Sequence, residues 1–122
     1  MTEELKINRA IRSFARRSGR MTLGQKHALS QYWPLYGLDY ETTEKGVSAA
    51  IQNYDAVILE IGFGNGDVLI EMAGNEPDIL HIGVEVHWPG VGRCLSIIDR
   101  DKLANIRLVS HDAVEVMQHM IP

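Results

Sequence analysis

Three closely spaced glycines form the stretch of this sequence with the clearest chemical potential. Gly62, Gly64 and Gly66 follow Glu60 in the order Glu-x-Gly-x-Gly-x-Gly. Glycine lets a backbone turn sharply and brings its N–H groups close to a bound ligand. Two interpretations are open: a loop that binds a nucleotide or cofactor, or a tight turn between a strand and a helix that binds nothing.

Two further carboxylates stand where ligands of nucleotide-binding folds are usually held. Glu85 lies near the end of the apolar run 81–86, and an acidic side chain there can accept hydrogen bonds from both hydroxyls of a ribose. Asp112 follows the apolar run 106–109 and could accept a hydrogen bond from an adenine amino group. Each also has a structural interpretation: Glu85 as an exposed carboxylate at a strand end, and Asp112 as the N-cap of a helix.

Apolar runs and helical periodicity predict the elements that position these residues. The expected order is strand, helix, strand, helix, strand, helix, over residues 57–61, 67–74, 81–86, 89–102, 106–109 and 114–120. In an open α/β sheet, ligands bind at the edge where the carboxyl ends of the strands meet. We therefore expect Glu60, Glu85 and Asp112 to face one crevice.

A basic arm precedes the α/β part. Residues 1–27 carry seven Lys and Arg against two Glu, a net charge of +5, whereas the rest of the chain carries −9. Arg outnumbers Lys in the arm, and its planar guanidinium suits bidentate contacts with phosphate. A solvated tail is the alternative, but the asymmetry favours nucleic acid. The candidate contacts are Arg12, Arg16, Arg17 and Arg20.

A short helix is expected between the arm and the first strand. Thr22 is the predicted N-cap of a helix over residues 23–32, and Pro34 is expected to end it. Tyr32 and Trp33 could stack on bases or anchor the core. The polar connector that follows, residues 38–52, is expected to hold a helical turn or two.

The composition fits one globular domain in a reducing, cytoplasmic compartment. The chain has 122 residues, of which 45% are hydrophobic, and no apolar run approaches the roughly 20 residues that span a bilayer. Its single cysteine, Cys94, has no disulfide partner and is expected to pack as a small apolar residue in a helix. The histidines lack metal-ligand spacing, so no metal site is predicted.

Several motifs together resemble bacterial tRNA (guanine-N7)-methyltransferases. They are Arg12-Ser13-Phe14, Tyr32-Trp33-Pro34, Leu59-Glu60-Ile61-Gly62-Phe63-Gly64, Ile82-Gly83-Val84-Glu85-Val86-His87 and His111-Asp112-Ala113-Val114. The resemblance extends over nearly the whole chain. It implies a partial class I S-adenosylmethionine-dependent methyltransferase fold, which is Rossmann-like, with the first three parallel strands and their helices.

In these terms the chain divides into a basic N-terminal extension and connector, residues 1–54, and the first half of a methyltransferase domain, residues 55–122. The resemblance implies S-adenosyl-L-methionine as the cofactor and guanosine in tRNA as the acceptor. Matching positions imply that the cofactor-binding residues are Glu60, Gly62, Gly64, Gly66, Glu85 and Asp112. The arginines of the arm would contact tRNA.

Members of that family continue with a fourth strand and a Pro-Asp-Pro-Trp type motif whose aspartate is assigned to the acceptor site. We therefore expect a chain truncated before the acceptor site, inactive or incomplete alone, and we nominate no catalytic residue. A non-catalytic fragment that binds S-adenosylmethionine or RNA is the alternative. A nicotinamide-dependent enzyme is disfavoured by the glycine spacing.

Without a fourth strand, the strand over residues 57–61 would form an apolar edge, and such edges invite association. We expect self-association along this edge, a cover from the N-terminal segment, or completion by a longer chain.

Overall fold

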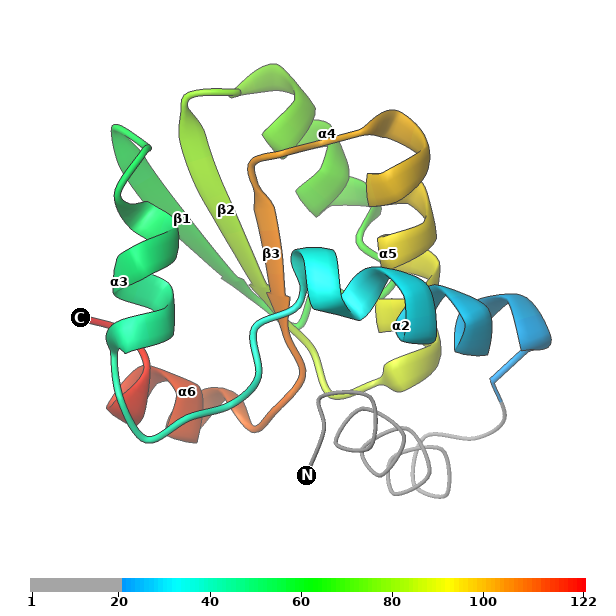
Figure 1. The fold of residues 1–122 in the computed structure, drawn as a ribbon, viewed down its shortest axis with the longest axis horizontal. Helices are drawn as coiled ribbons and strands as arrows, with labels where there is room; N and C mark the ends of the chain where they lie inside the picture. The colour runs from blue at the N-terminus through cyan, green and yellow to red at the C-terminus, as the bar shows by residue number, and fades with distance from the viewer. Residues whose placement is uncertain (1–20) are drawn as a thin grey trace.

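Two helices and then three strand–helix units make up the described part of the chain (Figure 1). The structure is a computed structural model, and it describes residues 21–122. The elements are α2 (Leu23–Tyr36), α3 (Lys45–Ile51), β1 (Ala56–Ile61), α4 (Asp67–Asn75), β2 (Ile79–Val84), α5 (Trp88–Asp101), β3 (Ile106–Val109) and α6 (Ala113–His119).

The three strands form one parallel sheet in the order β1-β2-β3. This confirms the predicted α/β arrangement. The predicted end of the second strand was wrong, because β2 ends at Val84 instead of Val86. The physical reason is that the side chain of Glu85 accepts hydrogen bonds from the N–H groups of Val86 and His87, which curls the backbone out of the sheet.

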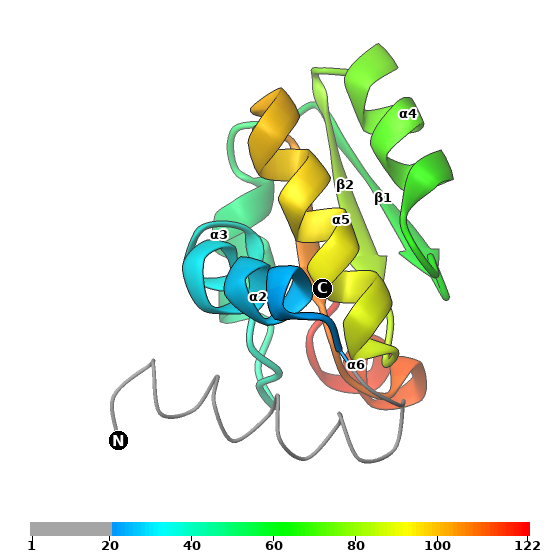
Figure 2. The ribbon, with the colours of Figure 1, turned by 90° about the vertical axis from the view of Figure 1, so that its right-hand side faces the viewer.

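Helices cover both faces of the sheet (Figure 2). Side chains alternate along each strand, so each face has its own core. One core joins β3 to α2, α4 and α5 and includes Leu29, Leu69, Leu95 and Leu108. The other joins the sheet to α3 and α6 and includes Leu80, Ile82, Val47 and Val116.

Helix α2 begins as predicted and ends later than predicted. Thr22 and Gln25 form a reciprocal capping box, with distances of 3.1 Å from Gln25 N to Thr22 Oγ1 and 2.9 Å from Thr22 N to Gln25 Oε1. Pro34 lies inside the helix, which continues to Tyr36. The prediction failed because proline removes one N–H bond, while the flanking turns are held by buried Trp33 against the core.

The two outer edges of the sheet differ. Outside β3, Leu38 donates its N–H to the Leu108 carbonyl at 2.8 Å, so the connector after α2 covers part of that edge. Within residues 21–122, the outer edge of β1 pairs with no strand. Val57 and Ile61 on this strand are 41% and 49% exposed. The predicted apolar edge is therefore present, and the described part of the N-terminal segment covers the opposite edge.

No helix among residues 21–122 is long and apolar enough to cross a membrane.

Candidate functional site at the strand ends

The glycine-rich loop turns the chain from β1 into α4. Gly62, Gly64 and Gly66 have φ angles of 74°, 62° and 84°, in the left-handed region that favours glycine. Gly66 is the N-cap of α4, and a Cβ atom there would collide with the thiol of Cys94. Cys94 itself is buried in α5, as predicted.

Helix α5 holds this loop from the side. A Cβ atom at Gly90 would collide with the carbonyl oxygen of Gly64, so the loop lies directly on the first turn of α5. The Arg93 guanidinium donates to Asp67 Oδ1 at 2.8 Å and to the Asn65 carbonyl at 3.2 Å. The Arg93–Asp67 pair is largely exposed and contributes little stability, but it ties both ends of the turn to one side chain.

The carboxylate of Glu85 connects the loop to the end of β2. Its Oε1 accepts the N–H of Gly64 at 2.7 Å, and its Oε2 accepts the N–H groups of Val86 at 2.8 Å and His87 at 3.1 Å. A carboxylate has about four acceptor positions. Backbone N–H groups within residues 21–122 use three of them, which leaves about one, on Oε1, for a ligand. The carboxylate is therefore oriented before any ligand arrives.

Asp112 occupies the corresponding place after β3. Its side chain accepts the N–H of Glu115 at 3.1 Å and caps α6, so the structural interpretation of Asp112 is confirmed. The cap uses one of the two carboxylate oxygens of Asp112, so the other can still accept a hydrogen bond from a ligand. A negative charge at this end of α6 is also favourable toward the helix dipole.

A small cavity of about 200 Å³ lies between the ends of the three strands. Its wall includes Gly62, Glu85, Val86, His111, Asp112 and Ala113. Drug-sized ligands usually occupy about 300–1,000 Å³, so the described residues enclose part of such a ligand. Carboxylates on two sides and apolar groups between them suit a flat, partly apolar group that carries hydrogen-bond donors.

The predicted site residues do not all line this cavity. Gly62, Glu85 and Asp112 do, and Gly64 reaches it through its bond to Glu85. Glu60 pairs with Gly83 in the sheet register and faces the side of the sheet covered by α4, away from the cavity wall. Gly66 is buried beneath the loop. The strand ends therefore converge as expected, but Glu60 does not join the other two carboxylates.

Sequence reasoning missed an aromatic stack beside the cavity. The rings of Tyr40 and His111 lie parallel, with centroids 3.6 Å apart and an interplanar angle of 5°. His111 Nε2 also lies 3.2 Å from Glu115 Oε1. Tyr40 belongs to a polar connector without periodicity, so no local signal pointed to it.

The predictions for the N-terminal segment have separate outcomes. Arg12, Arg16, Arg17 and Arg20 lie outside the described residues. Trp33 is a core anchor: it is 4% exposed, packs on Trp88 and donates its indole N–H to Asp39 at 2.8 Å. Within residues 21–122, no group of three or more His, Cys, Asp or Glu side chains is arranged to hold a metal ion.

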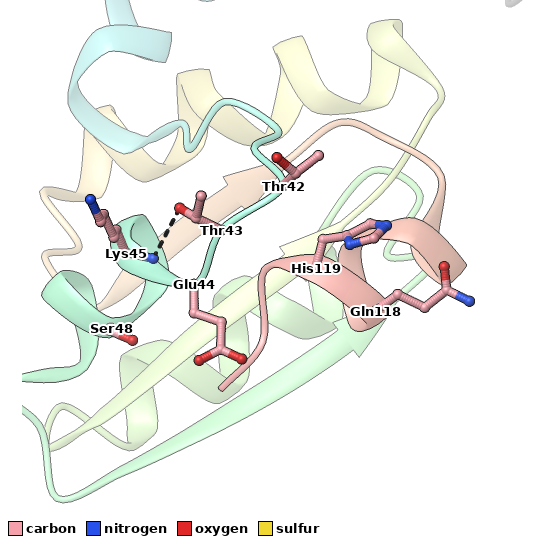
Figure 3. A pocket seen from close by; sticks show the side chains of 7 residues that line it. All are labelled: Thr42, Thr43, Glu44, Lys45, Ser48, Gln118 and His119. Atoms are coloured by element: carbon pink, nitrogen blue, oxygen red, sulfur yellow. Dashed lines mark hydrogen bonds between the residues drawn. The ribbon is translucent and has the colours of Figure 1, made fainter.

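A wider groove of about 530 Å³ lies between the start of α3 and the end of α6. Thr43, Lys45 and His119 contribute to its wall (Figure 3). Figure 3 shows the side chains of Lys45 and His119 well apart and directed to different sides. Because its polar groups do not converge, this groove is a weaker candidate than the cavity at the strand ends.

The comparisons with known proteins agree on one family. Residues 54–122 match the model of a family described as "Putative methyltransferase". The tRNA (guanine-N(7)-)-methyltransferase of Serratia proteamaculans is 48% identical over 114 residues, which are 93% of this chain and 48% of that protein. The enzyme of the same name from Aeromonas hydrophila is 48% identical over 98% of this chain and 51% of its own length.

The chain therefore spans about half the length of the curated relatives it matches. Among solved structures, the aminoglycoside resistance methyltransferase NpmB1 superposes with a TM-score of 0.53 at 23% identity, over 61% of this chain and 38% of that one. This likeness confirms the predicted methyltransferase fold. The resemblance inferred from the motifs is also confirmed.

Proposed function

The chain belongs to the methyltransferase family whose model its residues 54–122 match, and on that premise we propose that it is the donor-binding portion of an S-adenosylmethionine-dependent tRNA (guanine-N7)-methyltransferase. The 48% identity to proteins named for that activity supports the choice of substrate. A tRNA substrate would place the protein in the cytoplasm.

The observation that carries the proposal is the orientation of Glu85. Backbone N–H groups of the glycine loop and of the turn after β2 hold its carboxylate at the cavity, with one acceptor position on Oε1 left over by the described residues. A ribose hydroxyl of the donor would occupy that position. If Glu85 binds both ribose hydroxyls, its carboxylate must release one of the three backbone N–H groups that it accepts. Of these, the N–H of Gly64 is the one that belongs to the glycine loop.

The other predicted residues have different roles in this proposal. Asp112 would accept a hydrogen bond from the adenine amino group while still capping α6. Gly62 and Gly64 would let the donor approach the backbone, and Gly66 would set the start of α4. Glu60 faces the other side of the sheet. We therefore propose that it affects donor binding indirectly, through the glycine loop that follows β1.

S-adenosylmethionine supplies a methyl group on a positively charged sulfur. N7 of guanine carries a lone pair, so it would need no deprotonation to accept the methyl group that the donor supplies. Alignment then supplies most of the rate, because proximity alone is worth up to about 7–11 kcal/mol. The residues of this chain hold the donor, and we assign no catalytic residue among them.

The basic arm would bind the tRNA. Arg12, Arg16, Arg17 and Arg20 belong to the strongly positive residues 1–27, and phosphate contacts of this kind supply affinity and positioning without reading sequence. The acidic remainder of the chain would keep the tRNA at that end.

A second candidate is binding without turnover. The cavity of about 200 Å³ would enclose part of a nucleoside cofactor.

The outer edge of β1 pairs with no strand within residues 21–122. We propose that two copies of the chain associate through this edge, which would extend the sheet and cover Val57 and Ile61. Sedimentation at increasing concentration should reveal a dimer that Val57→Lys with Ile61→Lys abolishes, whereas a monomer throughout would contradict this association.

Isothermal titration with S-adenosylmethionine, S-adenosylhomocysteine and NAD tests the donor proposal. We expect the first two to bind and NAD not to bind. Glu85→Gln should weaken binding roughly 10- to 100-fold, as for loss of a hydrogen bond to a charged group. Glu71→Gln, at an exposed position of α4, is the matched control and should bind like the wild type. Binding of NAD alone, or of none, would contradict the proposal.

A further inference from the structure

The imidazole of His111 forms part of the wall of the cavity at the strand ends, next to Asp112. It lies in the short segment between β3 and α6, outside any helix or strand. A side chain on such a segment needs contacts of its own to keep one position. Among the described residues, His111 contacts the carboxylate of Glu115 at 3.2 Å and the ring of Tyr40.

The stack with Tyr40 is close and nearly parallel. The ring centroids are 3.6 Å apart and the planes differ by 5°, so one whole face of the imidazole is covered. The contact joins residues far apart in the chain. His119, at the end of α6, meets the same tyrosine edge-on at 6.4 Å and limits its movement from another side.

Tyr40 is itself held firmly. Two residues earlier, Leu38 donates its N–H to the Leu108 carbonyl of β3 at 2.8 Å. The preceding residue, Asp39, accepts the indole N–H of buried Trp33 at 2.8 Å. The backbone of Leu38 and the side chain of Asp39 thus tie the segment before Tyr40 to β3 and to α2, and this segment places the ring against the imidazole.

We propose that Tyr40 is a positioning residue for the donor cavity, because its ring fixes the imidazole of His111 in the wall against which the donor nucleoside binds. This inference rests on the proposed donor-binding function. It adds a residue from the connector after α2 to a site otherwise built from the ends of the three strands. Tyr40 acts through His111 and does not itself line the cavity.

The test is a titration of the 122-residue chain with S-adenosylhomocysteine. Tyr40→Phe keeps the stacked ring and should bind within about twofold of the wild type. Tyr40→Ala removes it and should weaken binding roughly fivefold, as for loss of one aromatic contact. Tyr54→Ala is the matched control: Tyr54 donates to the Ala104 carbonyl beyond the cavity wall, and its loss should leave the affinity unchanged even if it lowers the melting temperature.

A double-mutant cycle shows whether the effect passes through His111. His111→Ala alone should weaken binding by a similar factor, and adding Tyr40→Ala should weaken it no further. Independent, multiplying losses would overturn the positioning role. If Tyr40→Ala does not fold, Tyr40→Leu takes its place in the cycle.

The failures of the two proposals are distinguishable. Absence of binding by the wild-type chain would overturn the donor-binding function together with this inference. Normal binding by the wild type with equal affinity in Tyr40→Ala would overturn the positioning role alone.

Discussion

The thiol of Cys94 occupies the space that a Cβ atom on Gly66 would need. Gly66 also has a φ of 84°, so both its backbone conformation and its surroundings require glycine. The first turn of α4 can therefore lie directly on α5. This contact fixes the distance between the glycine loop and the helix that supports it.

Gly66→Ala should accordingly be severely destabilising. Left-handed strain costs about 1–2 kcal/mol and overpacking a further 1–3 kcal/mol, so we expect the free energy of unfolding to fall by about 2–5 kcal/mol. Urea denaturation measures this. The matched control is Gly46→Ala in α3, where a Cβ atom would meet nothing within 4 Å. It should be neutral or stabilise by about 0.5–1 kcal/mol, and equal losses in both variants would contradict the steric argument.

Cys94 should be inert in the folded protein. Burial raises the pKa of its thiol to about 12, so at pH 8 roughly one molecule in ten thousand carries the reactive thiolate. Mass spectrometry after treatment with iodoacetamide should find no label without denaturant and complete label in urea. Rapid labelling of the folded chain would show that α5 opens readily at this point.

Two substitutions at Asp112 should separate its role as a helix cap from its proposed role in ligand binding. Asp112→Ser keeps a good N-cap and should preserve the melting temperature, whereas Asp112→Ala should lower the free energy of unfolding by about 0.5–2 kcal/mol. Both changes remove the carboxylate and should weaken S-adenosylhomocysteine binding. Unchanged affinity in Asp112→Ser would leave Asp112 as a cap alone.

Asp99 should make the stability of the chain depend on acidity. Hydrogen bonds from Lys102 and Tyr36 lower the pKa of Asp99 below its usual value. The folded state therefore favours the carboxylate, and this stabilisation is present above pH 4 and lost as the pH falls through the lowered pKa. When melting temperatures are measured from pH 7 down to pH 2, they should fall less in Asp99→Asn than in the wild type. Asp78→Asn, at an exposed aspartate, is the control and should follow the wild type.

The arginines of the arm should govern tRNA affinity through charge. Arg16→Ala with Arg17→Ala should weaken tRNA binding and reduce the slope of log affinity against log salt by roughly one unit per lost phosphate contact. Filter binding at several salt concentrations measures both quantities. Arg100→Ala, at an exposed position on α5, is the control. A salt slope unchanged by loss of Arg16 and Arg17 would exclude the arm as the contact.

The elements whose signals lie in adjacent residues of the sequence could be predicted. The strand over residues 106–109 was predicted correctly, because its apolar run is bounded by polar residues. The sharp turn at the three glycines and the N-cap at Thr22 were also predicted, since each follows from one residue type in one context. The parallel order of the strands followed from the helix between each pair.

Two of the errors come from contacts between residues far apart in the chain, and one, at the end of β2, comes from a side chain that bonds to the backbone beside it. Pro34 did not end α2, because contacts of Trp33 with the core outweigh the lost N–H bond. The strand β2 stopped early because the side chain of Glu85 took the N–H groups that a longer strand would use. The stack of Tyr40 on His111 joins two segments that show no periodicity, so it could be found in the structure alone.

The pairing of Leu38 with Leu108 has a consequence for synthesis on the ribosome. Helix α2 and the connector after it are translated before α5 and β3, yet the surfaces they bury belong to those two later elements. The nascent chain must therefore carry an exposed Leu29 and Trp33 until about residue 108 has left the exit tunnel. A ribosome that stalls before β3 would therefore leave the buried face of α2, including Leu29 and Trp33, open to chaperones.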